Sequence, residues 1–150
     1  MNREELTAFV REINDLDYAC NTMLTEEYHA LLDENITNSQ IILLGHIHQR
    51  GRLLTGELSK IMNITPSAVS QNLNKLEKAG YIKRSINPDN RREIFVELDN
   101  AGIKYMENSE KIELSIIDRF YSKLDVEDLK NLKGIFSRFK AIIEKEKTQK

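Results

Sequence analysis

The stretch TPSAVSQNLNKLEKAGYIKRSINPDNRREIFVEL (residues 65–98) decides the fold, and its first half has the chemistry of a helix. Thr65 is a residue type that caps helices, and Pro66 suits the first helical position, where its missing N–H costs nothing. Gly80 is typical of the residue that follows the end of a helix. We therefore expect a helix over residues 66–79.

The second half of this stretch has the chemistry of two strands joined by a tight turn. Polar and apolar residues alternate over 81–86 and again over 93–98, which is the period of a strand with one buried face. Residues 87–90 (NPDN) between them are turn formers, and the proline stiffens the backbone there. Arg91 and Arg92 follow directly, so we expect an antiparallel β-hairpin with a basic tip.

Two shorter helices are predicted before residue 65. Thr37 and Gln40 have the spacing of a capping box, which predicts a helix from about 38 to 49. A third helix follows, with an apolar set of Leu54, Leu58, Ile61 and Met62. The order of three helices, a strand, a turn and a strand is that of a winged helix-turn-helix.

Long amphipathic helices flank this unit on both sides. Before Gly45 the chain has neither glycine nor proline, and apolar residues recur there at spacings of three and four, namely Leu6, Phe9, Ile13, Leu16, Cys20 and Met23. Helices are also expected over about 101–121 and after Asp125, the latter with a seam of Leu129, Leu132, Phe136, Phe139 and Ile143. The predicted fold is mainly α-helical with a small antiparallel β-hairpin.

The helix over 66–79 has two chemically different faces. Val69, Leu73 and Leu76 lie on one side at 100° per residue and are expected in the core. The opposite side has hydroxyl, amide and ammonium groups and no carboxylate, which suits hydrogen bonds to phosphates and base edges. An ordinary amphipathic surface helix would have the same division, so the helix alone does not decide the function.

The hairpin tip suits a narrow groove in nucleic acid. Arginine enters minor grooves with enhanced negative potential, because its guanidinium is weakly hydrated. We expect Arg91 to do so, Asp89 to support its side chain, and Arg92 to contact a backbone phosphate. The alternative is a hairpin whose charges only improve solubility.

Charge is distributed unevenly along the chain. The whole chain has a net charge of −2, which by itself argues weakly against a nucleic-acid partner. Residues 50–92, however, have nine basic and three acidic residues, a net charge of +6, which leaves −8 for the rest. This asymmetry favours one anion-binding lobe within an otherwise acidic protein.

The composition argues against a membrane protein, a secreted protein and a disulfide-bonded protein. Hydrophobic content is 40% and charged content 31%, which is typical of a soluble globular chain. The longest near-continuous apolar run is Ile41–Leu44, too short for a membrane span, and the first residues do not resemble a signal peptide. The single cysteine cannot form an intramolecular disulfide. We expect a cytoplasmic protein that does not act at a membrane.

Two segments resemble the MarR family of bacterial transcriptional regulators. PDNRREIFVELDNAG (88–102) is similar to that family's D-x-R wing motif, a strand and a helix-opening glycine, with Asp89 and Arg91 at the motif positions. Asp99 replaces the family's usual threonine and is still able to cap the next helix. SAVSQNLNKLEKAGYIKR (67–84) resembles the family's recognition helix and first wing strand.

The resemblance implies a homodimer held by residues 1–35 and 101–150, with residues 36–100 as the DNA-binding lobe. Recognition helices 66–79 would enter successive major grooves of a pseudo-palindromic operator in double-stranded DNA, and wings 86–93 the flanking minor grooves. The resemblance implies a transcriptional regulator, and we favour a repressor released by a small-molecule effector. The residues expected to contact DNA are Ser67, Ala68, Ser70, Gln71, Asn74, Lys75, Lys78, Arg84, Arg91 and Arg92.

The signal that such a regulator senses stays open. Cys20 is a candidate redox sensor, although it lies on an apolar stripe where a buried cysteine acts as a small hydrophobe. The histidines lack the spacing of one metal site, so neither a metal nor another cofactor is expected. A small organic effector is the remaining route, with Tyr18, Met23, Tyr28, His46 and Arg50 as candidate pocket residues. DNA binding without any effector is a further alternative.

Two other classes of function compete with DNA binding. Winged helices also dock proteins, but an interaction module would need an apolar or acidic face on helix 66–79. An enzyme is disfavoured, because the sequence has no glycine-rich phosphate loop, nucleophile elbow or HExxH motif.

Overall fold

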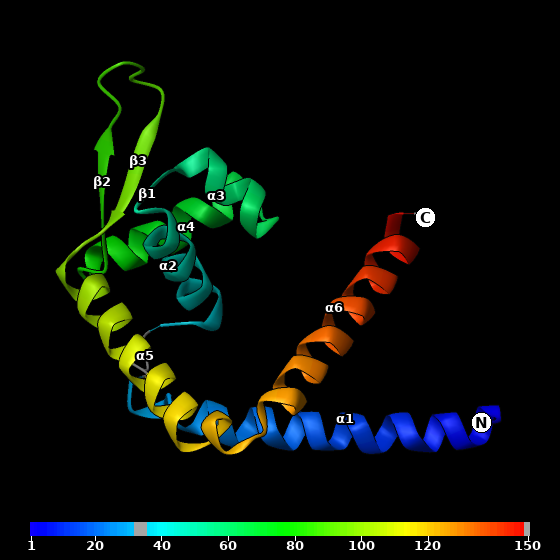
Figure 1. Cartoon of the computed structure of the whole chain (residues 1–150). Helices are drawn as coiled ribbons and strands as arrows, with labels where there is room; N and C mark the ends of the chain where they lie inside the picture. The colour runs from blue at the N-terminus through cyan, green and yellow to red at the C-terminus, as the bar shows by residue number, and fades with distance from the viewer. Residues whose placement is uncertain (32–35, 149–150) are drawn as a thin grey trace. The chain divides into compact units, whose positions relative to one another are not determined.

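The computed structural model describes residues 1–31 and 36–148 (Figure 1). The boundary that we predicted at residue 35, and the last two residues of the C-terminal tail, lie outside the described residues. The chain divides into two compact units, Met1–Ile112 and Glu113–Lys150. The elements are α1 (Arg3–Glu26), η1 (His29–Leu31), α2 (Asn38–Arg50), β1 (Arg52–Leu54), α3 (Thr55–Met62), α4 (Pro66–Lys78), β2 (Ile82–Ile86), β3 (Ile94–Leu98), α5 (Asn100–Arg119), η2 (Tyr121–Lys123) and α6 (Val126–Thr148).

The predicted fold class is confirmed, and the sheet has one strand more than expected. All three strands are antiparallel in the order β1-β3-β2, with β3 in the centre. Strand β1 pairs Leu53 with Val96, and the sequence prediction missed it because three residues are too short to show an alternating pattern. Leu54, which we had assigned to the third helix, ends β1 instead and occupies the N-cap position of α3.

A single apolar core joins helices α2, α3 and α4 to the sheet. Val69, Leu73 and Leu76 are almost completely buried, as their helical spacing predicted. The core is completed by Leu43, Leu44, Ile47, Leu53, Leu58, Tyr81, Ile82 and Val96. Burial of each large aliphatic side chain contributes about 1.5–3 kcal/mol relative to leaving it exposed. This core therefore determines which face of α4 is turned away from the protein.

The predicted helix ends are present. Thr37 and Gln40 form both hydrogen bonds of a capping box at the start of α2. The Thr65 hydroxyl accepts a hydrogen bond from the N–H of Ala68 at the start of α4, with Pro66 in the first turn. Gly80 follows α4 with a φ of 79°, a left-handed conformation that glycine adopts at low cost.

Gln40 also connects α2 to α4. Its side chain is the buried polar group of this core, with a relative exposure of 2%. The amide Nε2 donates to Oδ1 of Asn72 at 3.3 Å, and Asn72 donates in turn to the carbonyl of Ala68 at 3.1 Å. Because buried polar groups are costly without partners, this chain of hydrogen bonds helps to set how α4 sits on α2.

Helices α1 and α6 have no buried residue in the single chain. The apolar stripes that the sequence predicted are present but exposed, with Phe9 at 52% and Phe139 at 58% relative exposure. The Cys20 thiol, predicted to be buried on this stripe, is exposed as well. Among the described residues, no helix combines the length and the apolarity that crossing a membrane requires.

Candidate nucleic-acid interface

The outward face of α4 has the residues that the sequence assigned to it. Burial of its inner face leaves Ser67, Ser70, Gln71, Asn74, Lys75 and Lys78 exposed, while Ala68 is half-buried. These side chains offer hydroxyl, amide and ammonium groups along one side of the helix. Such a surface can donate hydrogen bonds to an anionic backbone and can both donate to and accept from base edges.

Arg84 of β2 is held against α4 by two residues of that helix. Its Nε donates to Glu77 Oε2 at 2.9 Å, and its Nη2 donates to Asn74 Oδ1 at 2.8 Å. The backbone N–H of Arg84 also donates to Glu77 Oε1 at 3.2 Å. These bonds connect the first wing strand to the helix. Sequence spacing did not predict them, because Arg84 and Asn74 belong to different elements.

The contact with Arg84 changes the acidity of Glu77. The hydrogen bond from the Arg84 side chain, assisted by its positive charge and its backbone N–H, holds the pKa of the Glu77 carboxyl below its usual value, and partial burial opposes this only in part. Glu77 is therefore anionic under ordinary conditions. It is the acidic residue of α4, and its charge is directed at Arg84 rather than at the outward face.

The ion pair between Glu77 and Arg84 is expected to show in the pH dependence of stability when the wild type is compared with Glu77→Gln. Because the folded pKa of Glu77 is depressed, its contribution is fully present above the unfolded pKa and is lost as pH falls through the folded value. The unfolding free energy of the wild type, measured by urea denaturation from pH 7 to pH 3, should therefore approach that of the variant as pH falls. Solvent screening keeps this effect small. A difference independent of pH would contradict the assignment.

The wing tip is built from two asparagines. The Asn87 side chain accepts a hydrogen bond from the N–H of Asp89 at 3.0 Å, and the Asn90 side chain accepts one from the N–H of Arg92 at 3.2 Å. The side-chain amide of Asn87 also donates to the Glu93 carboxylate at 2.8 Å, and the backbone N–H of Asn87 donates to the carbonyl oxygen of Glu93 at 2.9 Å. Side-chain bonds to amides two residues further on stabilise turns, so the tip has a defined shape.

Arg91 and Arg92 are both exposed on this tip. We expected Asp89 to support the Arg91 side chain, but within the described part of the chain these two side chains make no hydrogen bond or ion pair with each other. Asp89 contributes through its backbone N–H instead. Arg52 of β1 is a further exposed cation, which lies over the Phe95 ring at 3.9 Å from its centroid. Sequence reasoning missed this arrangement together with strand β1.

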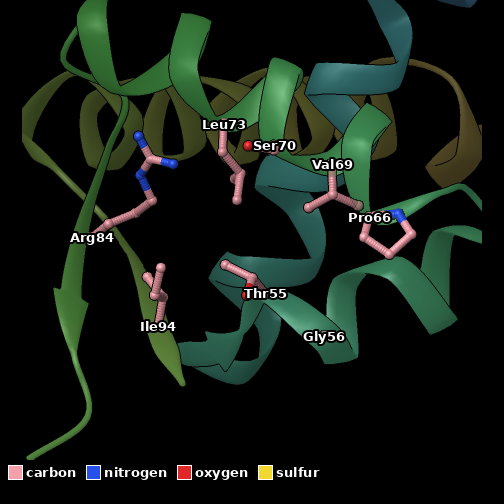
Figure 2. Close-up of a pocket in the computed structure, with 8 residues that line it drawn as sticks. All are labelled: Thr55, Gly56, Pro66, Val69, Ser70, Leu73, Arg84 and Ile94. Atoms are coloured by element: carbon pink, nitrogen blue, oxygen red, sulfur yellow. The ribbon is translucent and has the colours of Figure 1, made fainter. Parts of the chain in front are cut away.

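A pocket of about 170 Å³ opens between α3, α4 and the two wing strands. Figure 2 shows Thr55 and Gly56 on one side of it, Val69, Ser70 and Leu73 of α4 on another, and the Arg84 side chain extending from β2 toward α4. Pro66 and Ile94 complete the lining. Pockets for drug-sized ligands are typically about 300–1,000 Å³, so this one accommodates only a small group as it stands.

None of the five residues expected in an effector pocket lines this one. Tyr18 and Met23 are exposed on α1. His46 and Arg50 are one helical turn apart on α2, with Nδ1 of the histidine 3.4 Å from Nη1 of the arginine, and Tyr28 is half-buried. In the ranges 1–31 and 36–148, no three histidine, cysteine or carboxylate side chains are placed to hold a metal ion.

A family model described as MarR family matches residues 36–94. This range begins just before α2 and ends at the start of β3, so it contains the whole α4 surface and the wing tip. The match therefore falls on the part of the chain in which the sequence concentrates positive charge.

Proteins that are similar to this chain over longer ranges are described as HTH-type transcriptional regulators. The uncharacterized HTH-type transcriptional regulator YwhA of Bacillus subtilis (strain 168) is 27% identical over 130 residues, which cover 85% of this chain and 94% of YwhA. The HTH-type transcriptional repressor MdtR of the same organism is 27% identical over 104 residues, 69% of this chain and 67% of MdtR. The fold is shared with Streptococcus pneumoniae FabT, solved in complex with DNA, at a TM-score of 0.78 and 18% identity over 91% of this chain and 98% of that one.

Proposed function

Because this chain belongs to the MarR family of winged helix-turn-helix transcriptional regulators, we propose that it regulates transcription by binding a pseudo-palindromic operator as a homodimer. Helix α4 occupies the major groove and residues 86–93 reach the adjacent minor groove. The observation that carries this proposal is the exposed polar and basic face of α4 beside a defined turn with two arginines. The same polar face is unsuited to an apolar protein-docking site.

The proposed dimer is supported by the two exposed apolar stripes. Helices α1 and α6 present rows of large hydrophobic side chains that the single chain leaves in water. Contiguous exposed apolar surface of this kind marks an interaction site. In a dimer held by residues 1–35 and 101–150, two-fold symmetry places the two copies of α4 about one helical turn of DNA apart, 10–10.5 base pairs.

We further propose that the protein is a cytoplasmic repressor rather than an enzyme, and that a small molecule releases it from DNA. The repressor assignment is supported by the likeness to MdtR. The proposal that the effector is a small molecule rests on the resemblance to the family. The 170 Å³ pocket beside α4 is smaller than is typical for drug-sized ligands, so we propose that a larger effector binds elsewhere, where the dimer encloses more space.

Operator binding is expected to be strongly dependent on salt. If Lys75, Lys78 and Arg92 of both subunits each neutralise one phosphate, log K should fall with log salt with a slope of about −5. Fluorescence anisotropy with a labelled duplex from the DNA upstream of the protein's own gene would measure this slope, and adding candidate effectors would test release. A duplex of scrambled sequence and equal composition is the control. Equal affinity for the two duplexes would contradict a sequence-specific regulator.

A further inference from the structure

Building on the proposed DNA-binding function, on which this step rests, we propose that Arg84 orients the side-chain amide of Asn74, so that Asn74 presents its NH₂ group rather than its oxygen to DNA. The base pair that it meets is then read as guanine in preference to adenine. Arg84 acts as a positioning residue and Asn74 as a specificity-determining residue.

The Arg84 guanidinium is anchored before it reaches Asn74. Its Nε and Nη2 atoms both donate to Oε2 of Glu77, and the Glu77 carboxylate also accepts the backbone N–H of Arg84. The Arg84 side chain is 25% exposed and that of Glu77 is 37% exposed, so both are partly shielded from solvent. With these bonds in place, Nη2 lies 2.8 Å from Oδ1 of Asn74.

The chemistry of the two groups then determines which way the amide points. A guanidinium has five N–H donors and no acceptor, whereas an asparagine amide has one oxygen acceptor and two N–H donors on its nitrogen. Asn74 must therefore turn its oxygen toward Arg84, which places the NH₂ group on the other side. The opposite orientation would replace a charge-assisted hydrogen bond by two facing donors, a difference of about tenfold or more in population.

The remaining donors select among the bases of the major groove. Guanine presents two acceptors there, O6 and N7, whereas adenine presents the N7 acceptor and the N6 donor. An unconstrained asparagine uses its oxygen and its nitrogen together to bind adenine at N6 and N7. In Asn74 the Arg84 guanidinium occupies one of the two lone pairs of this oxygen, and its positive charge and N–H donors oppose the approach of the adenine N6 donor to the other. The two N–H donors of the outward NH₂ group match the O6 and N7 acceptors of guanine instead.

Selection from a randomised duplex library with the full-length protein tests this assignment. The wild type is expected to show one position in each half-site with at least about tenfold preference for guanine over adenine, and Asn74→Ala should remove that preference. Arg84→Met should bring guanine and adenine within about twofold at the same position, because the amide becomes free to turn. Lys83→Met is the matched control, since it removes a cation from the same strand without touching Asn74, and should leave the preference unchanged.

Asn74→Asp provides a second test, in which folding is not at risk because residue 74 is exposed. The exchange is nearly isosteric: it keeps an oxygen for Arg84 and replaces the outward N–H donors by an acceptor. Guanine preference should therefore be lost in favour of bases that donate in the major groove, cytosine or adenine. Guanine preference that survives Asn74→Asp or Arg84→Met, or base preferences that Asn74→Ala leaves unchanged, would overturn this inference alone. A wild type that selects no sequence would overturn the proposed DNA-binding function itself.

Discussion

Gly102→Ala is expected to destabilise the protein more than any other exchange of so small a group. A Cβ atom at this position would lie 2.1 Å from the carbonyl oxygen of Tyr81 and 3.2 Å from Cδ2 of Leu98. The Tyr81 oxygen cannot move away freely, because it accepts the N–H of Asp99 at 2.9 Å. Relief of the clash requires α5 to shift away from the start of the hairpin. We expect a loss of about 3 kcal/mol or more, at the upper end of overpacking effects.

Gly45→Ala is the matched control for this exchange. Gly45 lies within α2, and a Cβ there would meet no heavy atom within 4 Å. Alanine is favoured over glycine in a helix by about 1 kcal/mol, so this variant should be slightly more stable than the wild type. Urea denaturation followed by circular dichroism, at one protein concentration for all variants, measures both changes. Similar stabilities for the two variants would contradict the packing described around Gly102.

Arg91→Ala is expected to have the largest effect on DNA binding. A specific arginine contact is worth about 1–3 kcal/mol, and the proposed dimer has two copies of it, so operator affinity should fall by about 2–6 kcal/mol, at least roughly 30-fold. Arg91 is exposed on the wing tip and its side chain supports no part of the core, so folding should be unaffected. Fluorescence anisotropy with the operator duplex measures the loss. Unchanged affinity of a folded Arg91→Ala dimer would remove the wing from the proposed mechanism.

Arg92→Ala separates the two roles assigned to neighbouring arginines. As a phosphate contact, Arg92 should affect the operator and the scrambled duplex alike, and its loss should reduce the magnitude of the salt slope by about 2 for the dimer. Arg91→Ala, which removes a proposed minor-groove contact, should instead reduce the preference for the operator over the scrambled duplex. Identical effects of the two variants on both duplexes would show that the arginines are equivalent.

Local chemistry explains why most elements were predictable from the sequence. Thr65 and Gly80 determine the ends of α4 through backbone capping, which needs no distant partner. The inner face of α4 follows from helical spacing alone, and Asn87 and Asn90 form their turn with residues a few positions away. Strand β1 was not predictable in this way, because its three residues form a strand only by pairing with β3.

The candidate site was likewise predictable from the sequence only in part. Which side chains α4 and the wing tip expose was readable from the sequence, whereas the partners of Arg84 were not. We assigned Arg84 to DNA contact by its charge and position. In the structure its guanidinium is bonded to Glu77 and Asn74, seven and ten positions away in the chain. The expected Asp89–Arg91 contact, by contrast, was inferred from sequence proximity and is absent among the described residues.

The sequence by itself determined the helices, the hairpin and the basic tip, because capping, periodicity and turn formation depend on neighbours in the chain. Only the tertiary structure decided that the sheet has a third strand, that Gly102 must lack a side chain, and that Asn74 turns its oxygen toward Arg84. These features depend on which atoms meet when distant segments pack together. A hydrogen bond or a clash is determined by distances of a few tenths of an ångström, which sequence spacing does not specify.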